Sequence, residues 1–291
     1  MQAIIFYLTL PFLYLLSILP FPIFYLFSDF VFVLVYYIIG YRKKVVTENL
    51  RNSFPKKSDK EISIIRIKFY RYLCDLFLET FKTFTIGRNS MLKHCKMNEE
   101  AYKLFQKYYE EEKKIIIVMG HFGNWEWAGN TFSICCKHQL YVIYHPLENK
   151  YFDKLIIGMR TRFGTKLIKM KNTFRDMIVN KKIINATAFI ADQTPAPENA
   201  YWTTFLNQDT PVFYGTEKIA RNMNYPVVFV NIKRLRRGYY EFFAETLFEN
   251  PAQTKEGEIS EAHTKRLEEE IIKQPEIWIW SHRRWKHKRN V

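Results

Sequence analysis

The first 41 residues contain a single charged side chain, Asp29, and no Lys, Arg or His. Three basic residues, Arg42, Lys43 and Lys44, follow at once and make the sharpest compositional boundary in the chain. A stretch this long with one charge is typical of a membrane segment, and a buried hydrophobic hairpin of a soluble protein is the less favoured alternative. We therefore interpret residues 1–41 as a membrane anchor.

Pro20 and Pro22 divide this anchor in two. Residues 3–19 include Pro11 and extend only about 25 Å as a helix, slightly less than the hydrocarbon thickness of a bilayer. Residues 21–40 are long enough but carry Asp29 near their middle. We predict one inserted segment followed by one that lies at or re-enters the interface, with a two-span hairpin as the alternative. The basic cluster at 42–44 predicts that the following chain is cytoplasmic, and the lack of a basic start or a small-residue cleavage site disfavours a signal peptide.

Residues 42–112 have the pattern of a helical region. Within residues 45–85, Ser58 and Glu61 have the spacing of a capping box, and apolar residues recur after them at helical intervals. Residues 98–112 form a second helical stretch that ends in a charged run. These patterns predict helices that precede the main domain.

Residues 113–291 alternate between two kinds of pattern. Apolar runs of strand length are at 115–119, 140–144, 187–191 and 227–232, and helical patterns are at 125–138, 150–163, 172–181 and 215–223. Residues 239–247 have the pattern of a further edge strand, and residues 258–273 that of a helix. The alternation predicts an α/β fold, with a mixed sheet flanked by helices and a basic C-terminal segment.

The charge balance favours a negatively charged partner. The chain has 44 basic and 29 acidic residues, a formal net charge of +15, which suits nucleic acid, an anionic membrane or a phosphorylated substrate. The four cysteines lack metal-ligand spacing, and the adjacent Cys135 and Cys136 are expected in a helix, so disulfides are disfavoured.

The stretch GHFGNWEWAGN, residues 120–130, places His121 two residues after the predicted strand 115–119. In open α/β sheets, chemistry gathers at the carboxyl ends of strands. Asn124 is a good N-cap, so Glu126 is expected in the first turn of the next helix. Positions 121 and 126 would diverge by about 140° on one helix, which disfavours metal binding by this pair.

A loop histidine beside a first-turn carboxylate has the composition of a general base. The carboxylate would accept a hydrogen bond from one ring nitrogen and leave the other nitrogen free to take a proton. The sequence has no GxSxG elbow and no cysteine near His121, so the nucleophile would be a hydroxyl of the substrate and the reaction an acyl transfer. A histidine that only packs beside Trp125 or Trp127 is the alternative, and the two tryptophans either pack under the helix or line an acyl groove.

Four other segments, taken together with GHFGNWEWAG, resemble one family in the same order. They are VTENLRNSFPKKSDKEI, YHPLENKYFDKLIIGMRTRFG, ADQTP and PEIWIWSHRRWK. The first block resembles that of the lysophospholipid acyltransferase superfamily. More narrowly, the chain is similar to the lipid A biosynthesis acyltransferases, the lauroyl and myristoyl transferases, over most of its length.

This resemblance implies roles for particular residues. His121 would be the base and Glu126 its partner, while Arg160 and Arg162 would serve the substrate or its oxyanion. Asp192 and Gln193 would shape the acceptor site. From the residues alone, the two arginines are equally well explained as exposed helix charges, and Asp192 as a turn residue after a strand.

The resemblance also implies substrates and a location. The donor would be an acyl carrier protein thioester and the acceptor a phosphorylated glycolipid of the Kdo-lipid A type, with no metal and no other cofactor. The enzyme would bind an anionic phospholipid membrane at the cytoplasmic face of the bacterial inner membrane. Phe205-Leu206-Asn207-Gln208 and YGTEKIAR depart from the family pattern, so the acyl length and the acceptor stay open.

Three other functions compete with this one. An acyltransferase acting on another lipid acceptor would share the same chemistry. A membrane-tethered nucleic-acid-binding protein would explain the charge but not the HxxxxE turn, and the sequence has no nucleic-acid motif. A membrane hydrolase would use water as the acceptor. The basic end, His282 to Arg289, would bind anionic head groups or form a solvated tail.

Overall fold

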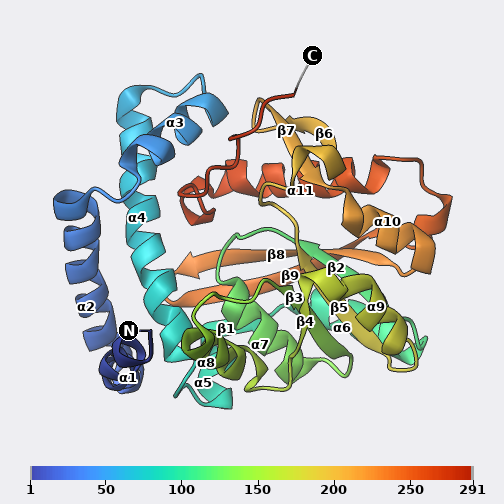
Figure 1. Cartoon of the computed structure of the whole chain (residues 1–291), viewed down its shortest axis with the longest axis horizontal. Coiled ribbons are helices and arrows are strands. Elements are labelled where there is room, and N and C mark those ends of the chain that lie inside the picture. The colour runs from blue at the N-terminus through green and yellow to red at the C-terminus, as the bar shows by residue number, and fades with distance from the viewer. Residues whose placement is uncertain (1, 290–291) are drawn as a thin grey trace.

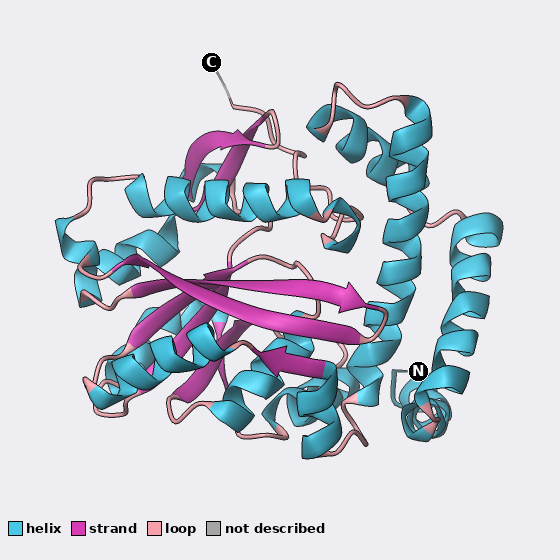
Figure 2. Cartoon of the chain, turned by 180° about the vertical axis from the view of Figure 1, so that it is seen from behind, coloured by secondary structure: helices cyan, strands magenta, loops and turns pink. Residues whose placement is uncertain are grey.

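A seven-stranded sheet with strand order β1-β9-β8-β2-β5-β3-β4 runs through the middle of the computed structural model, which describes residues 2–289 (Figures 1 and 2). The strands are β1 (Cys95–Met97), β2 (Ile115–Met119), β3 (Gln139–Tyr144), β4 (Lys166–Lys169), β5 (Asn185–Ile190), β8 (Val227–Arg236) and β9 (Tyr239–Phe248). β8 and β9 pair antiparallel, whereas the other neighbours pair parallel. The sheet is therefore mixed, and the predicted α/β class is confirmed.

Helices cover both faces of the sheet (Figure 1). In β2, Ile115 and Ile117 pack in one apolar cluster with α5 (Arg88–His94), α6 (Glu99–Glu110) and α7 (Trp125–Cys135). Ile116 and Val118 pack in the opposite cluster with α4 (Asp59–Lys82), α10 (Tyr214–Met223) and α11 (Glu258–Lys273). Because successive strand residues point to opposite faces, a strand covered on both sides is a continuous apolar run.

The structure confirms most of the predicted elements of the α/β region. The four predicted strands coincide with β2, β3, β5 and β8, and the predicted helices with α7, α8 (Lys150–Thr161), α9 (Thr173–Val179), α10 and α11. Residues 239–248 form β9 as expected, but β1 pairs with its outer side, so β9 is not at the edge. Within residues 42–112, β1 and the short helix α5 lie outside the two predicted helical stretches.

Several elements differ from the sequence interpretation. Residues 45–85 contain two helices, α3 (Lys43–Ser53) and α4, because the chain breaks at Phe54 and Pro55. The Ser58–Glu61 capping box at the start of α4 is present. The short strands β1 and β4 and the separate hairpin of β6 (Ala200–Phe205) and β7 (Gln208–Phe213) were not predicted.

The apolar N-terminal residues form α1 (Gln2–Ile18) and α2 (Phe21–Val33), which continues as a π-helical turn to Ile39. Both helices lie at one end of the molecule, and α2 runs beside α4 (left in Figure 1). By length and composition, the helix Phe21–Ile39 is long enough to cross a membrane and α1 is shorter. On length and composition alone, the second apolar segment meets the requirement for a membrane span, and the first, in which the sequence interpretation placed the inserted part, is shorter.

Candidate active site

His121 and Asp192 meet at the carboxyl ends of two adjacent parallel strands. Met119 at the end of β2 pairs with Ile190 at the end of β5, and each of the two polar residues follows two positions later. His121 Nδ1 lies 2.6 Å from Asp192 Oδ1, and the backbone N–H of His121 donates to Asp192 Oδ2 at 2.8 Å. The carboxylate therefore fixes both the backbone and the ring of His121.

The contacts of the Asp192 carboxyl group keep it ionised. Its side chain is only 3% exposed, and burial alone would raise its pKa, but His121 and the hydrogen bonds to the carboxylate hold the pKa well below its usual range. One of those bonds comes from Trp278 Nε1, 2.8 Å from Asp192 Oδ2. A buried carboxylate held in this way accepts the Nδ1–H of His121 and leaves Nε2 as the basic nitrogen.

Two glycines make room for this turn. Gly123 has φ +61°, and a Cβ there would lie 2.3 Å from the carbonyl oxygen of Ile232. A Cβ on Gly120 would lie 2.6 Å from Leu267 Cδ2 and 3.1 Å from Asp192 Oδ2. The glycines on both sides of His121 are required by close approach and, at Gly123, also by the left-handed backbone.

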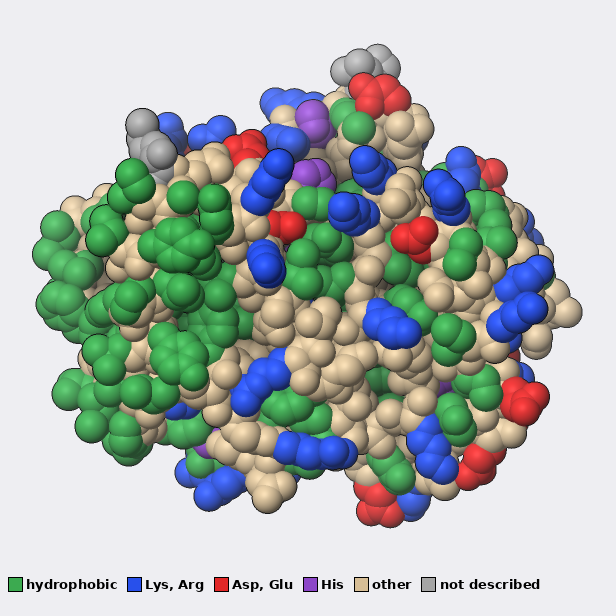
Figure 3. All heavy atoms as spheres, turned by 60° about the horizontal axis from the view of Figure 1, so that its bottom comes forward, with side chains coloured by type: hydrophobic (Ala, Val, Ile, Leu, Met, Phe, Trp, Pro, Cys, Tyr) green, Lys and Arg blue, Asp and Glu red, His purple; other side chains and the backbone are tan. Residues whose placement is uncertain are grey.

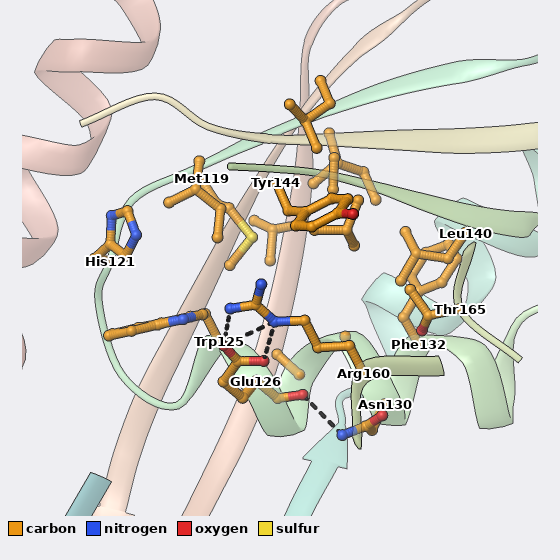
Figure 4. Close-up of a pocket in the computed structure, with 18 of the residues that line it drawn as sticks. Met119, His121, Trp125, Glu126, Asn130, Phe132, Leu140, Tyr144, Arg160 and Thr165 are labelled. Carbon is orange, nitrogen blue, oxygen red and sulfur yellow. Dashed lines mark hydrogen bonds and ion pairs between the residues drawn. The ribbon is translucent and has the colours of Figure 1, made fainter. Parts of the chain in front are cut away.

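Glu126 pairs with Arg160 rather than with His121 (Figure 4). Arg160 Nε donates to Glu126 Oε2 at 2.9 Å, and Arg160 Nη2 also contacts this carboxylate. Asn124 caps α7 through its side chain, so Glu126 lies in the first helical turn, and there its carboxylate meets Arg160 of α8. In place of the predicted hydrogen bond between His121 and Glu126, His121 pairs with Asp192 and Glu126 pairs with Arg160.

A cavity of about 390 Å³ opens between α7, α8 and the sheet. His121, Glu126, Arg160 and Gln193 line its polar part. Its other part is apolar and includes Phe132, Leu140, Val230 and Phe242. Figure 4 shows His121 at one end, Arg160 and Glu126 in the middle, and Leu140 and Phe132 toward the other end. The cavity thus joins a polar reaction centre to a chamber of hydrocarbon character.

The two tryptophans of the motif have different positions. Trp125 lines the cavity and meets the His121 ring edge to face, with 4.9 Å between ring centroids. Trp127 is fully buried, and its Nε1 donates to the backbone oxygen of Glu79 at 3.0 Å. Trp125 therefore borders the site, whereas Trp127 packs under α7.

A family model described as bacterial lipid A biosynthesis acyltransferase matches residues 1–287. The chain belongs to this family. Two curated relatives, the lipid A biosynthesis palmitoleoyltransferase of Escherichia coli (strain K12) and the lipid A biosynthesis acyltransferase of Shigella flexneri, are each 22% identical over 248 residues. The alignments cover 84% of this chain and 79% of each relative. As a member of the family, the protein is an acyltransferase.

Of the other predicted residues of this acyltransferase, Gln193 lies at the site and Arg162 does not. Gln193 lies at the site, with its Nε2 3.4 Å from His121 Nε2. Arg162 does not line the cavity, because its Nη1 donates to the backbone oxygens of Thr83 and Ile86, the latter at 2.7 Å. Arg162 holds the end of α8 against the segment that follows α4.

The sequence interpretation missed the residues that support the site from behind. Trp278, in the segment PEIWIWSHRRWK, donates to Asp192, and Tyr72 donates to the backbone oxygen of Gly123 at 2.7 Å. Glu79 accepts a hydrogen bond from Asn124 Nδ2 at 2.8 Å. No local spacing predicts these contacts, since each joins segments that are distant in the sequence.

Proposed function

We propose that this acyltransferase moves a fatty acyl chain from an acyl carrier protein thioester to a hydroxyl group of a lipid A precursor of the Kdo-lipid A type. The observation that carries the proposal is the His121–Asp192 pair at one end of a cavity that is largely apolar (Figure 4). A base with an orienting carboxylate and a chamber for an alkyl chain are the two parts that this reaction requires. The names of the two relatives support the same acceptor class.

In the first step, His121 acts as the general base. The acceptor hydroxyl gives its proton to His121 Nε2 as its oxygen attacks the thioester carbonyl carbon. A carbon–oxygen bond forms, and the electron pair of the carbonyl moves to its oxygen. Asp192, which accepts a hydrogen bond from Nδ1, stabilises the imidazolium that results.

Arg160 faces the same cavity and supplies positive charge to the oxyanion. Burial alone would lower the pKa of Arg160, but the Glu126 carboxylate raises it above the ordinary value, so the guanidinium stays charged. A cation held in place before the reaction stabilises developing negative charge at no cost of reorganisation. Glu126 is thus a positioning residue, which acts through Arg160.

The intermediate then collapses to products. The carbonyl forms again, the carbon–sulfur bond breaks, and the leaving sulfur takes the proton from His121 Nε2. A thiolate is a good leaving group, so this step requires little further catalysis. The products are the acylated lipid and the free thiol of the carrier, and none of the steps uses a metal or a prosthetic group.

Charge and hydropathy support the proposed partners. The net charge of +15 suits an acidic carrier protein, an anionic phospholipid membrane and a phosphorylated acceptor. The apolar helices α1 and α2 suit attachment to the bacterial inner membrane, with the catalytic region on the cytoplasmic face. Nucleic acid has no place in this proposal.

The test is a reaction of purified protein with a lipid A precursor and acyl carrier protein thioesters, followed by mass spectrometry of the lipid. We expect a mass increase equal to one acyl group minus one hydrogen. Acylation of another lipid in a membrane extract, but not of the precursor, would replace the proposed acceptor. Release of free fatty acid without acylated lipid would indicate a hydrolase and contradict the proposal.

A further inference from the structure

The second apolar helix is docked along its whole length against α4. Four contacts recur at about one-turn intervals in an antiparallel register, and they join Tyr25 to Glu79, Ser28 to Asp75, Phe32 to Arg71 and Tyr36 to Arg66. Two are short hydrogen bonds, of 2.8 Å for Tyr25–Glu79 and 2.7 Å for Ser28–Asp75. Any plane that cuts across α2 therefore also cuts across α4.

The β8–β9 turn secures the middle of the same helix. Arg237 binds Asp29 of α2 at 2.9 Å and Asp75 of α4 at 2.7 Å. A Cβ on Gly238 would lie 2.1 Å from Tyr25 Oη, so the turn approaches α2 closely. The single charge of the apolar segment, Asp29, thus has its partner in the catalytic domain.

Helix α4 has charges that do not belong in hydrocarbon. Lys68 and Arg71 are exposed, and Asp75 and Glu79 lie buried between α4 and its neighbours. If α2 crossed a bilayer in its docked position, these side chains would lie at the depth of the lipid tails, where charges are costly. Helix α2 therefore cannot cross a bilayer while it stays docked on α4.

The side of α1 and α2 that faces away from α4 is a continuous apolar surface. The buried side of α2 contains Phe24, Ser28, Phe32 and Tyr36 at every fourth position. The exposed large apolar residues of this segment include Ile23, Leu26, Phe30, Val33 and Tyr37. Exposed residues of α1, including Ile4, Leu8, Phe12 and Leu15, extend this surface. Figure 3 shows the resulting concentration of hydrophobic side chains at the left end of the molecule.

We propose that α1 and α2 bind a single leaflet and lie in the plane of the membrane without crossing it. One leaflet fits better than a second copy of the chain, because basic side chains border the apolar surface and suit anionic head groups. They include Arg71, whose guanidinium carbon lies 5.1 Å from the centroid of the Phe32 ring, and Lys43, whose Nζ lies 4.0 Å from the centroid of the Tyr36 ring. The inference rests on the membrane attachment proposed above and is independent of the acyl-transfer chemistry.

This arrangement places the reaction cavity beside the leaflet. Phe6 of α1 packs on Tyr151 and Phe152 at the start of α8, with ring centroids 5.5 and 5.2 Å apart. Helix α8 also lines the cavity, through Asp153 and Arg160. The helix that borders the reaction centre is thus fixed to the membrane-bound surface.

Depth measurements on the full chain test this proposal. Ile23→Cys, Phe30→Cys and Tyr37→Cys, each in a background with Cys135→Ser and Cys136→Ser, receive a nitroxide label and bind phosphatidylethanolamine–phosphatidylglycerol vesicles. We expect one shallow depth for all three labels. A crossing helix would place residue 30 about 10 Å deeper than residues 23 and 37, given the helical rise of 1.5 Å per residue, and that result would overturn the inference.

A matched pair of variants tests the surface itself. Leu26 and Val179 are 70% and 71% exposed, but Val179 lies on α9, away from the apolar surface. We expect Leu26→Asp to lower the partition into vesicles at least tenfold and Val179→Asp to leave it unchanged. Equal effects, or protection of the labels by self-association without lipid, would contradict the proposal. Absence of vesicle binding in the unsubstituted protein would overturn the membrane attachment as well, whereas acyl transfer would remain a separate result.

Discussion

His121 Nδ1 lies 2.6 Å from Asp192 Oδ1, although 71 positions separate the two residues in the sequence. We expect Asp192→Asn to lower kcat by about 10²- to 10⁴-fold, because an amide does not accept the Nδ1–H with the same strength and stabilises the imidazolium poorly. The measurement is the steady-state rate of acyl transfer, with circular dichroism to verify folding. A rate within threefold of the unsubstituted protein would remove Asp192 from the mechanism.

The Glu126–Arg160 pair is expected to act as one unit. Arg160→Gln should lower kcat by about 10²- to 10³-fold through loss of the charge at the oxyanion, and adding Glu126→Gln should cost little more. Glu126→Gln alone should leave the acid limb of the pH–rate profile in place, whereas Asp192→Asn should move it. If Glu126→Gln moved that limb instead, Glu126 would be the partner of His121 as first interpreted from the sequence.

Arg162 is expected to affect stability and not catalysis. Arg162→Gln removes the donor to the backbone oxygens of Thr83 and Ile86, which should lower the free energy of unfolding by about 0.5–1.5 kcal/mol. Urea titration measures this change, and Arg160→Gln, near the end of α8, is the contrasting variant for the loss of kcat. A large loss of kcat in folded Arg162→Gln protein would place Arg162 at the substrate.

The apolar part of the cavity is expected to set the length of the acyl chain. Gly129 lines the cavity, and an added Cβ would have only Leu140 Cδ2 nearby, at 3.9 Å. Gly129→Leu should fit the helix, fill part of the chamber and shift the preference toward shorter chains, with Gly129→Ala as a milder control. Competition among acyl carrier thioesters of different lengths, read by mass spectrometry, measures the shift. An unchanged preference would place the acyl chain elsewhere.

His263 is expected to make the fold sensitive to acid. It is buried on α11, and burial lowers its pKa from 6.5 to about 4. Between these values the unfolded chain binds a proton that the folded chain does not, so stability falls as the pH decreases. This group contributes a loss of about 2–3 kcal/mol between pH 7 and pH 4.5.

A comparison with His263→Gln isolates that contribution, because burial also lowers the pKa of His94, His138 and His282. The quantity measured is the free energy of unfolding of both proteins at pH 7 and at pH 4.5. The variant should lose less stability over this interval than the unsubstituted protein. Equal losses would mean that His263 takes a proton in the folded state.

The sheet was largely predictable because its strands are buried on both faces. Ile115 to Met119 form an unbroken apolar run, which predicts β2 correctly. The β6–β7 hairpin escaped prediction because Leu206 and Asn207 both adopt positive φ at its turn, an unusual conformation for Leu, and because Pro211 lies within a strand. Short strands such as β1 have too few residues to show a pattern.

The sequence interpretation named several residues that meet at this candidate site, but it did not predict how they pair, and it included Arg162, which lies away from the cavity. His121, Glu126, Arg160 and Gln193 line one cavity, and Asp192 contacts His121 from behind it. Sequence spacing favours Glu126 as the partner of His121, since it is five positions away. The strand order instead makes Asp192 the partner of His121, because β2 and β5 are neighbours whose carboxyl ends are in register. That order depends on long-range packing, which no local pattern contains.

The central claim is that His121 is the base of an acyl transfer to a lipid A precursor. Its most direct test is the rate of acylated-lipid formation from an acyl carrier protein thioester by purified His121→Gln and by the unsubstituted protein, with both shown to be folded. The account predicts a loss of at least about 10³-fold, in keeping with removal of a general base. A rate for His121→Gln within threefold of the unsubstituted protein would contradict it.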